Sequence, residues 1–291
     1  MATPNETWRI GDTELTTIVE AETAGIPAAL FYPDIADDHL AASADWMVEG
    51  AVGDDMTITF RVQAFLLRHR GLTVVVDPCV GNHKNLAMPF WAHQDLPWME
   101  HLIEAGVAPD QVDLVIHTHL HEDHIGWDTH LVEGEWVPTF PNARHVYVGN
   151  ELEWASSEKR RQIHDAFSES IAPVFDAGLS WEVDGDADLG DGLRLLSTPG
   201  HTPGHSSLEV ETGSERLVIT GDVLHHPFQF AAPDVAEVGD QDPDRARTVR
   251  CDLFADLADS DAVVAGTHFP IASVGRVETH AGAWRWGPIS S

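Results

Sequence analysis

A run of metal-capable side chains follows directly after an apolar strand in the middle of this chain. The strand is predicted over residues 112–116, and residues 119–124 after it read His-Leu-His-Glu-Asp-His. Imidazoles two positions apart at the end of a strand project toward one point, and the Asp and His that follow can reach a second point nearby. Neutral imidazoles around a carboxylate suit zinc or another divalent first-row metal. The alternative is a polar loop in a chain that holds 18 histidines among its 291 residues.

Three further predicted strands end close to a residue that can bind a metal. These strands cover 193–197, 217–220 and 262–265, and the candidates after them are His201, Asp222 and His268. Gly and Pro residues in loop 198–206 force a tight turn, which holds one imidazole in a fixed direction. A single His or Asp after a strand is more often a structural hydrogen-bonding residue than a ligand. Four such strand ends in one chain favour a metal centre.

Strand and helix patterns alternate along the chain without a linker, which predicts a single domain of the α/β class over residues 1–291. Strands are predicted over 57–67 and 72–76 around a turn at Arg70-Gly71. Helices are predicted over 151–175 and over 246–257, the second starting at Asp242-Pro243. Residues 83–100 fit neither period and are expected to form a long loop, which is either a lid over a site or a packed satellite cluster.

Composition argues against several classes of protein. No stretch approaches the roughly 18–20 apolar residues that span a bilayer, and residues 1–6 lack the pattern of a signal peptide. Cys79 and Cys251 cannot form a disulfide framework. We therefore expect a cytoplasmic protein without a membrane partner.

The charge balance adds a second constraint. The formal net charge is −32, which repels phosphate backbones, so no nucleic-acid partner is expected. The basic run 159–161 is short and is predicted to be the solvated face of a helix. The acid excess also suits a salt-adapted protein, a hypothesis that a melting temperature unchanged between low and molar salt would contradict.

The order of the metal-capable residues resembles that of the metallo-β-lactamase superfamily, whose pattern is HxHxDH followed by a His, an Asp and a His. The resemblance extends from about Thr57 to His268 and gives a core of about 57–270. It implies an αββα sandwich of two mixed β-sheets flanked by helices. The residues that match the pattern are His119, His121, Asp123, His124, His201, Asp222 and His268.

Family roles at these positions imply two divalent metal ions per chain. The first would be held by His119, His121 and His201, and the second by Asp123, His124 and His268, with Asp222 bridging both. Zinc is the first choice, although iron, manganese and cobalt accept the same ligand types.

Three residues near the ligands receive supporting roles. Asp77 falls where the family has an early aspartate that supports a ligand, and His205 is expected to close the loop that orients His201. His117 would permit a different register, HxHxH, but that register leaves Asp123 and His124 without a role. We therefore expect His117 to be a strand residue or a support for the ligands.

The implied ligand set predicts hydrolysis. Two cations about 3.5–4 Å apart can share a hydroxide, with the pKa of bound water lowered toward ~7, which attacks a carbonyl or phosphoryl centre at neutral pH. Asp222 would fix the metal separation, and Asp123 could pass a proton to the leaving group, so both are expected to be catalytic. No nucleophile-elbow sequence GxSxG is present.

Residues 221–229 and 266–270 look most like the branch of N-acyl-homoserine lactonases and methyl-parathion-hydrolase-like enzymes. This likeness predicts opening of a small-molecule lactone or cleavage of a related ester, with promiscuous phosphotriesterase activity as an extension. Some lactonases carry a Tyr three residues after the bridging Asp; here His225 either hydrogen-bonds the substrate or lines the pocket. Core packing and an apolar substrate pocket explain equally well the aromatic residues Phe90, Trp91, Trp98 and Phe228.

Other functions stay open at this stage. A thioesterase of the glyoxalase II kind would use the same metal centre, and a mononuclear iron persulfide dioxygenase would use part of it. A metal-binding protein without catalysis is a further alternative. An aromatic N-terminal half and loop 83–100 would suit a homodimer contact.

Overall fold

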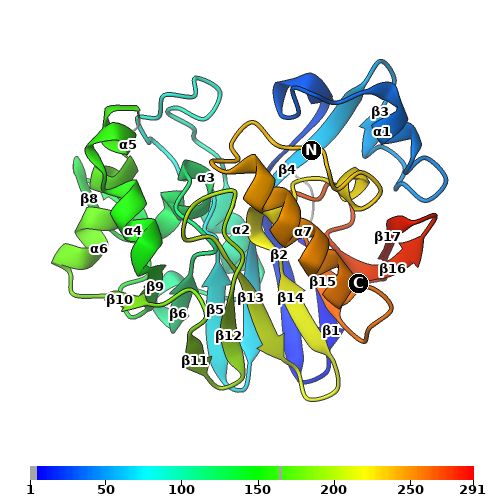
Figure 1. Cartoon of the computed structure of the whole chain (residues 1–291). Coiled ribbons are helices and arrows are strands. Elements are labelled where there is room, and N and C mark those ends of the chain that lie inside the picture. The colour runs from blue at the N-terminus through cyan, green and yellow to red at the C-terminus, as the bar shows by residue number, and fades with distance from the viewer. Residues whose placement is uncertain (1–4, 164–165) are drawn as a thin grey trace. The chain divides into compact units, whose positions relative to one another are not determined.

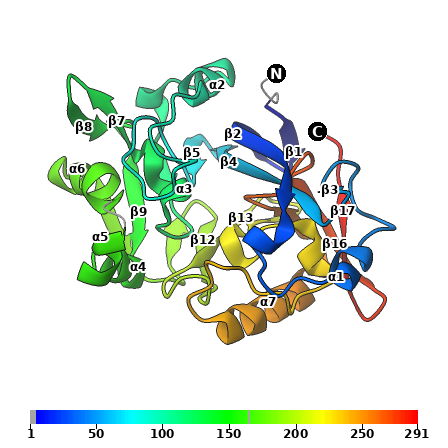
Figure 2. The same cartoon turned by 90° about the horizontal axis from the view of Figure 1, so that it is seen from above.

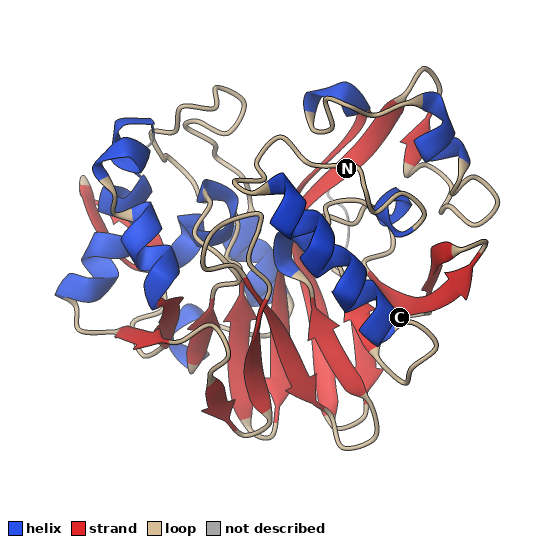
Figure 3. Cartoon of the chain, in the orientation of Figure 1, coloured by secondary structure: helices blue, strands red, loops and turns tan. Residues whose placement is uncertain are grey.

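Two compact units, each built around a mixed β-sheet, make up this chain. The structure is a computed structural model that describes residues 5–163 and 166–291. The first unit comprises Met1–Glu20 and Val62–Gly185, and the second comprises Ala21–Arg61 and Asp186–Ser291. Figure 1 labels the elements, and Figure 3 shows that the chain combines strands with helices. This combination confirms the predicted α/β class.

The sheet that belongs mostly to the first unit has the described strand order β1-β2-β4-β5-β6-β9-β10, and β3 also pairs with β4. Strands β5, β6, β9 and β10 are parallel, and Val76 in β5 is in register with Ile116 in β6. The carboxyl ends of β5 and β6 therefore lie at one edge of the sheet, which brings Asp77 close to the start of the His run. The strands are Thr7–Ile10 (β1), Thr13–Pro27 (β2), Val52–Gly53 (β3), Thr57–His69 (β4), Leu72–Val76 (β5), Leu114–Ile116 (β6), Arg144–Val148 (β9) and Ser180–Val183 (β10).

Short helices and one hairpin complete the first unit. The hairpin of β7 (Thr129–Val132) and β8 (Glu135–Pro138) lies beside α6, as Figure 2 shows. The helices are Trp98–Glu104 (α2), Glu122–Ile125 (α3), Gly149–Ala155 (α4), Glu158–Ile163 (α5) and Ala172–Asp176 (α6), with 3₁₀ turns at Pro109–Gln111 and Gly126–Asp128.

Segment 151–175 is largely helical, as predicted, but it is divided among α4, α5, a π-helical segment and α6. Helix α4 ends at Ala155, where the Ser157 hydroxyl bonds back to the Trp154 carbonyl and competes with further helical hydrogen bonds. A π-helical segment at Phe167–Ile171 then precedes α6, in which Pro173 has no backbone N–H to donate. Residues 164 and 165 of the predicted helix lie outside the described residues.

The second unit contains a sheet whose strands β11 to β17 neighbour one another in chain order. Helix α7 (Pro243–Leu257) connects the parallel strands β14 and β15, so both strands end at the same edge of this sheet. The apolar face of α7 packs with Phe230, Val264 and Trp286 in one buried cluster. The remaining elements are α1 (Asp37–Ala41), β11 (Asp188–Gly190), β12 (Leu193–Ser197), β13 (Ser206–Glu211), β14 (Arg216–Ile219), β15 (Val263–Ala265), β16 (Val274–His280), β17 (Ala283–Pro288) and 3₁₀ turns at Ala28–Leu30, Gly221–Val223 and Pro227–Phe230.

Most predicted strand ends are confirmed within a few residues. The turn between β4 and β5 falls at Arg70 and Gly71, both with positive φ, and α7 begins after Asp242, whose carboxylate accepts the Arg245 N–H. The predicted strand before the His run is shorter than expected, and loop 83–100 ends earlier, at Pro97, because α2 begins at Trp98. Among the described helices, none has the length and apolar character that a bilayer span requires.

Candidate metal centre

The His run of the first unit leaves the sheet after β6 and turns into the short helix α3. His119 Nε2 lies 2.9 Å from His121 Nδ1, and His124 Nε2 lies 3.7 Å from Asp123 Oδ1. His119, Asp123 and His124 are buried, whereas His121 is half-buried. Within this unit, the structure therefore brings His119 next to His121, which were predicted to share the first metal. It also brings Asp123 next to His124, which were predicted to share the second.

Asp77 links the end of β5 to this run. Its backbone has a φ of 52°, a left-handed conformation that Asp adopts more readily than most residues. Its carboxylate accepts hydrogen bonds from the Thr118 N–H and hydroxyl, both at 2.8 Å. The same carboxylate lies 3.1 Å from His124 Nδ1, which favours the tautomer with the lone pair on Nε2.

Two buried glutamates that the sequence analysis missed support the backbone around the run. Glu20 accepts hydrogen bonds from the Val80 and Gly81 N–H groups at 2.9 and 3.0 Å and from the Trp127 indole at 2.7 Å. Burial raises the pKa of Glu20 to about 7, although these donors favour its charged form. Glu151, also buried, accepts a backbone N–H of the His run at 3.1 Å.

His117 belongs to a separate buried cluster of the first unit. Its Nδ1 donates to the Val146 carbonyl at 2.9 Å, and its Nε2 lies 2.9 Å from Asp128. His145 and the Tyr147 hydroxyl contact the same carboxylate at 3.2 and 2.9 Å. Burial alone lowers the pKa of His117, but Asp128 raises it above its ordinary value. His117 directly follows the last residue of β6, and these contacts join it to Asp128 and β9 rather than to a predicted ligand.

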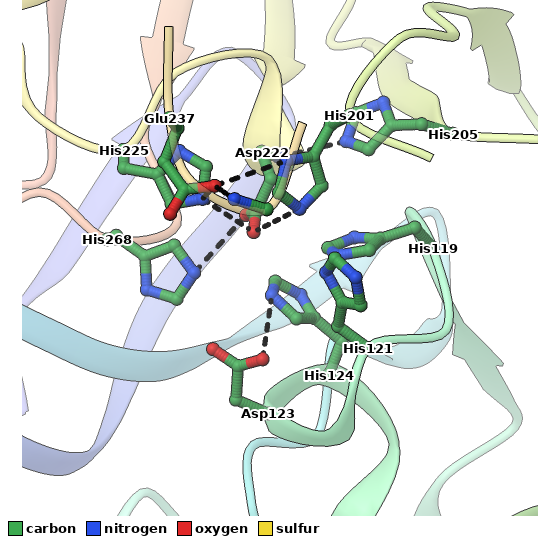
Figure 4. Close-up of polar contacts among 12 residues, drawn as sticks. His119, His121, Asp123, His124, His201, His205, Asp222, His225, Glu237 and His268 are labelled. Carbon is green, nitrogen blue, oxygen red and sulfur yellow. Dashed lines mark hydrogen bonds and ion pairs between the residues drawn. The ribbon is translucent and has the colours of Figure 1, made fainter. Parts of the chain in front are cut away.

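In the second unit, three imidazoles point at one carboxylate (Figure 4). Nε2 of His201 lies 3.4 Å and Nε2 of His225 lies 3.1 Å from Asp222 Oδ2, while Nε2 of His268 lies 3.2 Å from Asp222 Oδ1. All four side chains are nearly inaccessible to solvent. Asp222 follows β14 and His268 follows β15, so the parallel pairing of these strands brings both ligand candidates to one edge.

Hydrogen bonds to the opposite ring nitrogens show that this cluster fits a divalent cation. His268 Nδ1 donates to the Arg61 carbonyl at 2.8 Å, and His201 Nδ1 donates to Asp240 at 3.0 Å. A neutral imidazole that donates from Nδ1 carries its lone pair on Nε2. In two of the three imidazoles, His201 and His268, an Nε2 lone pair therefore faces the Asp222 carboxylate. A cation among these atoms would accept both lone pairs.

His205 and His225 differ in what they do around Asp222. His205 bonds Thr198 through Nδ1 and accepts the Asp222 backbone N–H through Nε2, both at 2.9 Å. It therefore fixes the turn of Asp222 as well as the loop that carries His201. The His225 ring stacks on the His268 ring with an interplanar angle of 4°.

Two acidic residues beside His201 were missed in the sequence. Asp240 Oδ1 accepts from His201 Nδ1, and Glu237 Oε2 lies 3.8 Å from the same nitrogen. Burial raises the pKa of Glu237 to about 7. The pKa of Asp240 would also be raised by burial, but its hydrogen bond to His201 lowers it below its ordinary value.

The predicted pocket aromatics lie in different surroundings. Phe90 is 59% exposed in the long loop of the first unit and contacts Trp91 edge-on. Trp98 is fully buried and stacks on Trp127. Phe228 is fully buried against Tyr32 in an apolar cluster of the second unit, which the core-packing alternative explains.

The chain belongs to the Metallo-beta-lactamase superfamily, whose family profile matches residues 58–266. This match confirms the fold predicted from the ligand order, with mixed β-sheets flanked by helices. The matched stretch begins near the start of β4 and ends just after β15, so it contains every residue of the family pattern except His268.

Relatives and solved structures agree with this family. N-acyl homoserine lactonase AttM of Rhizobium radiobacter is 30% identical over 56% of this chain and 65% of its own length, and an N-acyl homoserine lactonase of Bacillus thuringiensis is 30% identical over 45% and 47%. The chain thus spans about half to two thirds of the length of these relatives. A hydrolase of the beta lactamase superfamily, AbOPH, has a TM-score of 0.84 at 25% identity and covers 100% of this chain and 99% of its own. AidC, a dizinc quorum-quenching lactonase in complex with a product, has a TM-score of 0.79 at 20% identity, with coverages of 99% and 98%.

Proposed function

We propose that this protein is a metal-dependent hydrolase that opens a lactone or cleaves a related ester. The observation that carries the proposal is the convergence of three imidazole Nε2 atoms on Asp222 at 3.1–3.4 Å in the second unit. Relatives named N-acyl homoserine lactonase support the choice of substrate class.

We further propose that both units act as one functional domain, because each carries part of the family's ligand pattern. His119, His121, Asp123 and His124 come from the first unit. His201, Asp222 and His268 come from the second. Following the family pattern, these residues would hold two divalent ions, with zinc as the first choice.

The chemistry divides between the metal ions and the protein. When bound, the two ions would supply a water of lowered pKa and polarise the substrate carbonyl. Asp222 would hold the ion-binding imidazoles in one arrangement, and Asp77 and Asp240 would keep the imidazoles beside them in the tautomer that can bind. Asp123 would deliver a proton to the leaving oxygen, and His225, which the family pattern does not use, would line the substrate side.

Metal content tests the centre first. Protein purified without chelator should contain two divalent ions per chain by elemental analysis, and dialysis against a strong chelator should abolish hydrolysis until zinc is restored. One iron per chain, with no activity gained from a second equivalent of metal, would contradict the dinuclear proposal and favour a mononuclear iron enzyme.

A substrate panel then tests the reaction. N-acyl homoserine lactones and simple aryl esters should be turned over with higher kcat/KM than S-acyl glutathione thioesters, and a phosphotriester serves as the probe of promiscuous activity. Preference for the thioesters would overturn the lactonase proposal and leave the metal centre intact. The proposed partner is thus a small lactone or ester, while a homodimer stays a prediction.

A further inference from the structure

Arg250 is an arginine buried in the middle of α7, where a charge is costly unless its N–H groups are paired. Its Nε donates to the Val223 carbonyl at 2.7 Å. Its Nη1 donates to the carbonyls of Pro233 and Val235 at 3.0 and 2.9 Å, and its Nη2 lies 3.4 Å from Asp240 Oδ2. One guanidinium therefore contacts the segment after Asp222, the following loop and the Asp240 carboxylate.

Asp240 connects Arg250 to His201, because its carboxylate contacts both side chains. A carboxylate can only accept hydrogen bonds, so the 3.0 Å contact to His201 Nδ1 requires the proton to be on Nδ1. The other oxygen of Asp240 accepts the Glu237 N–H at 3.1 Å and contacts Arg250. Both oxygens are thus engaged, and His201 is held with its Nε2 lone pair facing Asp222.

The loop that carries His201 packs against the same face of α7. A Cβ on Gly200 would come within 2.4 Å of the Ala246 backbone, and Gly200 has a φ of 145°. Ala246 and Arg250 are four residues apart and so share one helix face. Backbone bonds from Gln241 to His201 and from Asp242 to Gly200, at 3.0 and 2.9 Å, join the two loops.

We infer that Asp240 and Arg250 are positioning residues that set the tautomer and direction of His201 and tie it to the segment of Asp222. This inference rests on the proposed metal centre. It predicts that Asp240 acts on cation binding itself, beyond any effect on folding, because removal of the carboxylate frees His201 to carry its proton on Nε2.

Cobalt titration tests the inference without relying on turnover. Metal-free wild-type protein and the Asp240→Ala variant are titrated with Co²⁺ while the visible absorption bands and the dissociation constants are recorded. We expect Asp240→Ala to bind Co²⁺ about 10–100-fold more weakly and with altered bands per bound ion, because loss of a residue that orients a ligand typically has this effect. Asp240→Asn keeps the size and one acceptor oxygen, so its loss should be smaller.

Asp234→Ala is the matched control, since Asp234 lies in the same loop but makes an exposed ion pair with Arg247 of α7. It should bind Co²⁺ like the wild type. Melting of each metal-free variant by circular dichroism identifies a folded sample. A folded Asp240→Ala with wild-type affinity and spectrum would overturn the inference, whereas a wild-type protein that binds no Co²⁺ would overturn the proposed function instead.

Discussion

Gly126 is the position where one added methyl group should do the most damage to the first unit. Its φ of −62° is accessible to any residue, so backbone strain is not the issue. A Cβ there would lie 1.7 Å from the Val80 carbonyl oxygen and 2.6 Å from the Gly81 nitrogen. These are backbone atoms, and no side chain can rotate away to relieve the overlap. Gly126→Ala must therefore push two backbone segments apart.

The expected loss of stability follows from the backbone hydrogen bonds that join these segments. Gly126 N–H donates to the Cys79 carbonyl at 2.7 Å, and Trp127 N–H donates to the Pro78 carbonyl at 2.8 Å. Losing two backbone bonds costs about 1 kcal/mol each, and overpacking adds about 1–3 kcal/mol, which gives a total of about 3–5 kcal/mol. Because Gly126 directly follows α3, the strain falls next to His124.

Urea denaturation of the metal-free protein measures this loss. Gly287→Ala is the control, since its Cβ would meet only ordinary contact, 3.8 Å from the Arg276 carbonyl, and should change the free energy of unfolding by less than about 0.5 kcal/mol. If the free energy of unfolding of Gly126→Ala lies within about 1 kcal/mol of the wild-type value, the inference that a close backbone contact at Gly126 positions α3 is wrong.

Two further predictions concern the second unit. Asp222→Ala should reduce lactone turnover more than about 100-fold while the protein stays folded, since it removes the carboxylate that three imidazoles share; a folded, active variant would contradict its role. Burial lowers the pKa of His226 from 6.5 to about 4. The unfolded chain therefore binds this proton first as pH falls from 6.5 to 4, and the stability due to His226 is lost in that window. His226→Gln should flatten the dependence of unfolding free energy on pH between 7 and 5 in the metal-free protein. An unchanged slope would argue against a lowered pKa of His226 in the folded state.

Elements with a clear apolar pattern were predictable from the sequence, whereas strands with buried polar residues were not. Strand β4 is buried almost throughout, and its β-branched and aromatic residues indicate a strand. Strand β2 buries Thr13 and Glu20, which bond His69 and the loop after β5, so its hydropathy resembles that of an exposed segment. Strand β16 carries the half-buried Arg276 and the exposed Glu278, which make its pattern polar, and it too escaped prediction.

The candidate ligands were predictable because their order along the chain is itself the signal, but their supports depend on contacts between distant residues. Asp240 is 39 residues from His201, and no local spacing connects the two. Arg250 did offer a signal, since it shares the apolar spacing of helix 243–257 with Ala246, Leu253 and Leu257, all buried. An arginine in an apolar stripe requires a buried anion and carbonyl acceptors. The acidic loop just before this helix is the nearest source of that anion. A buried Arg250 therefore predicts a buried carboxylate in this loop, which is Asp240.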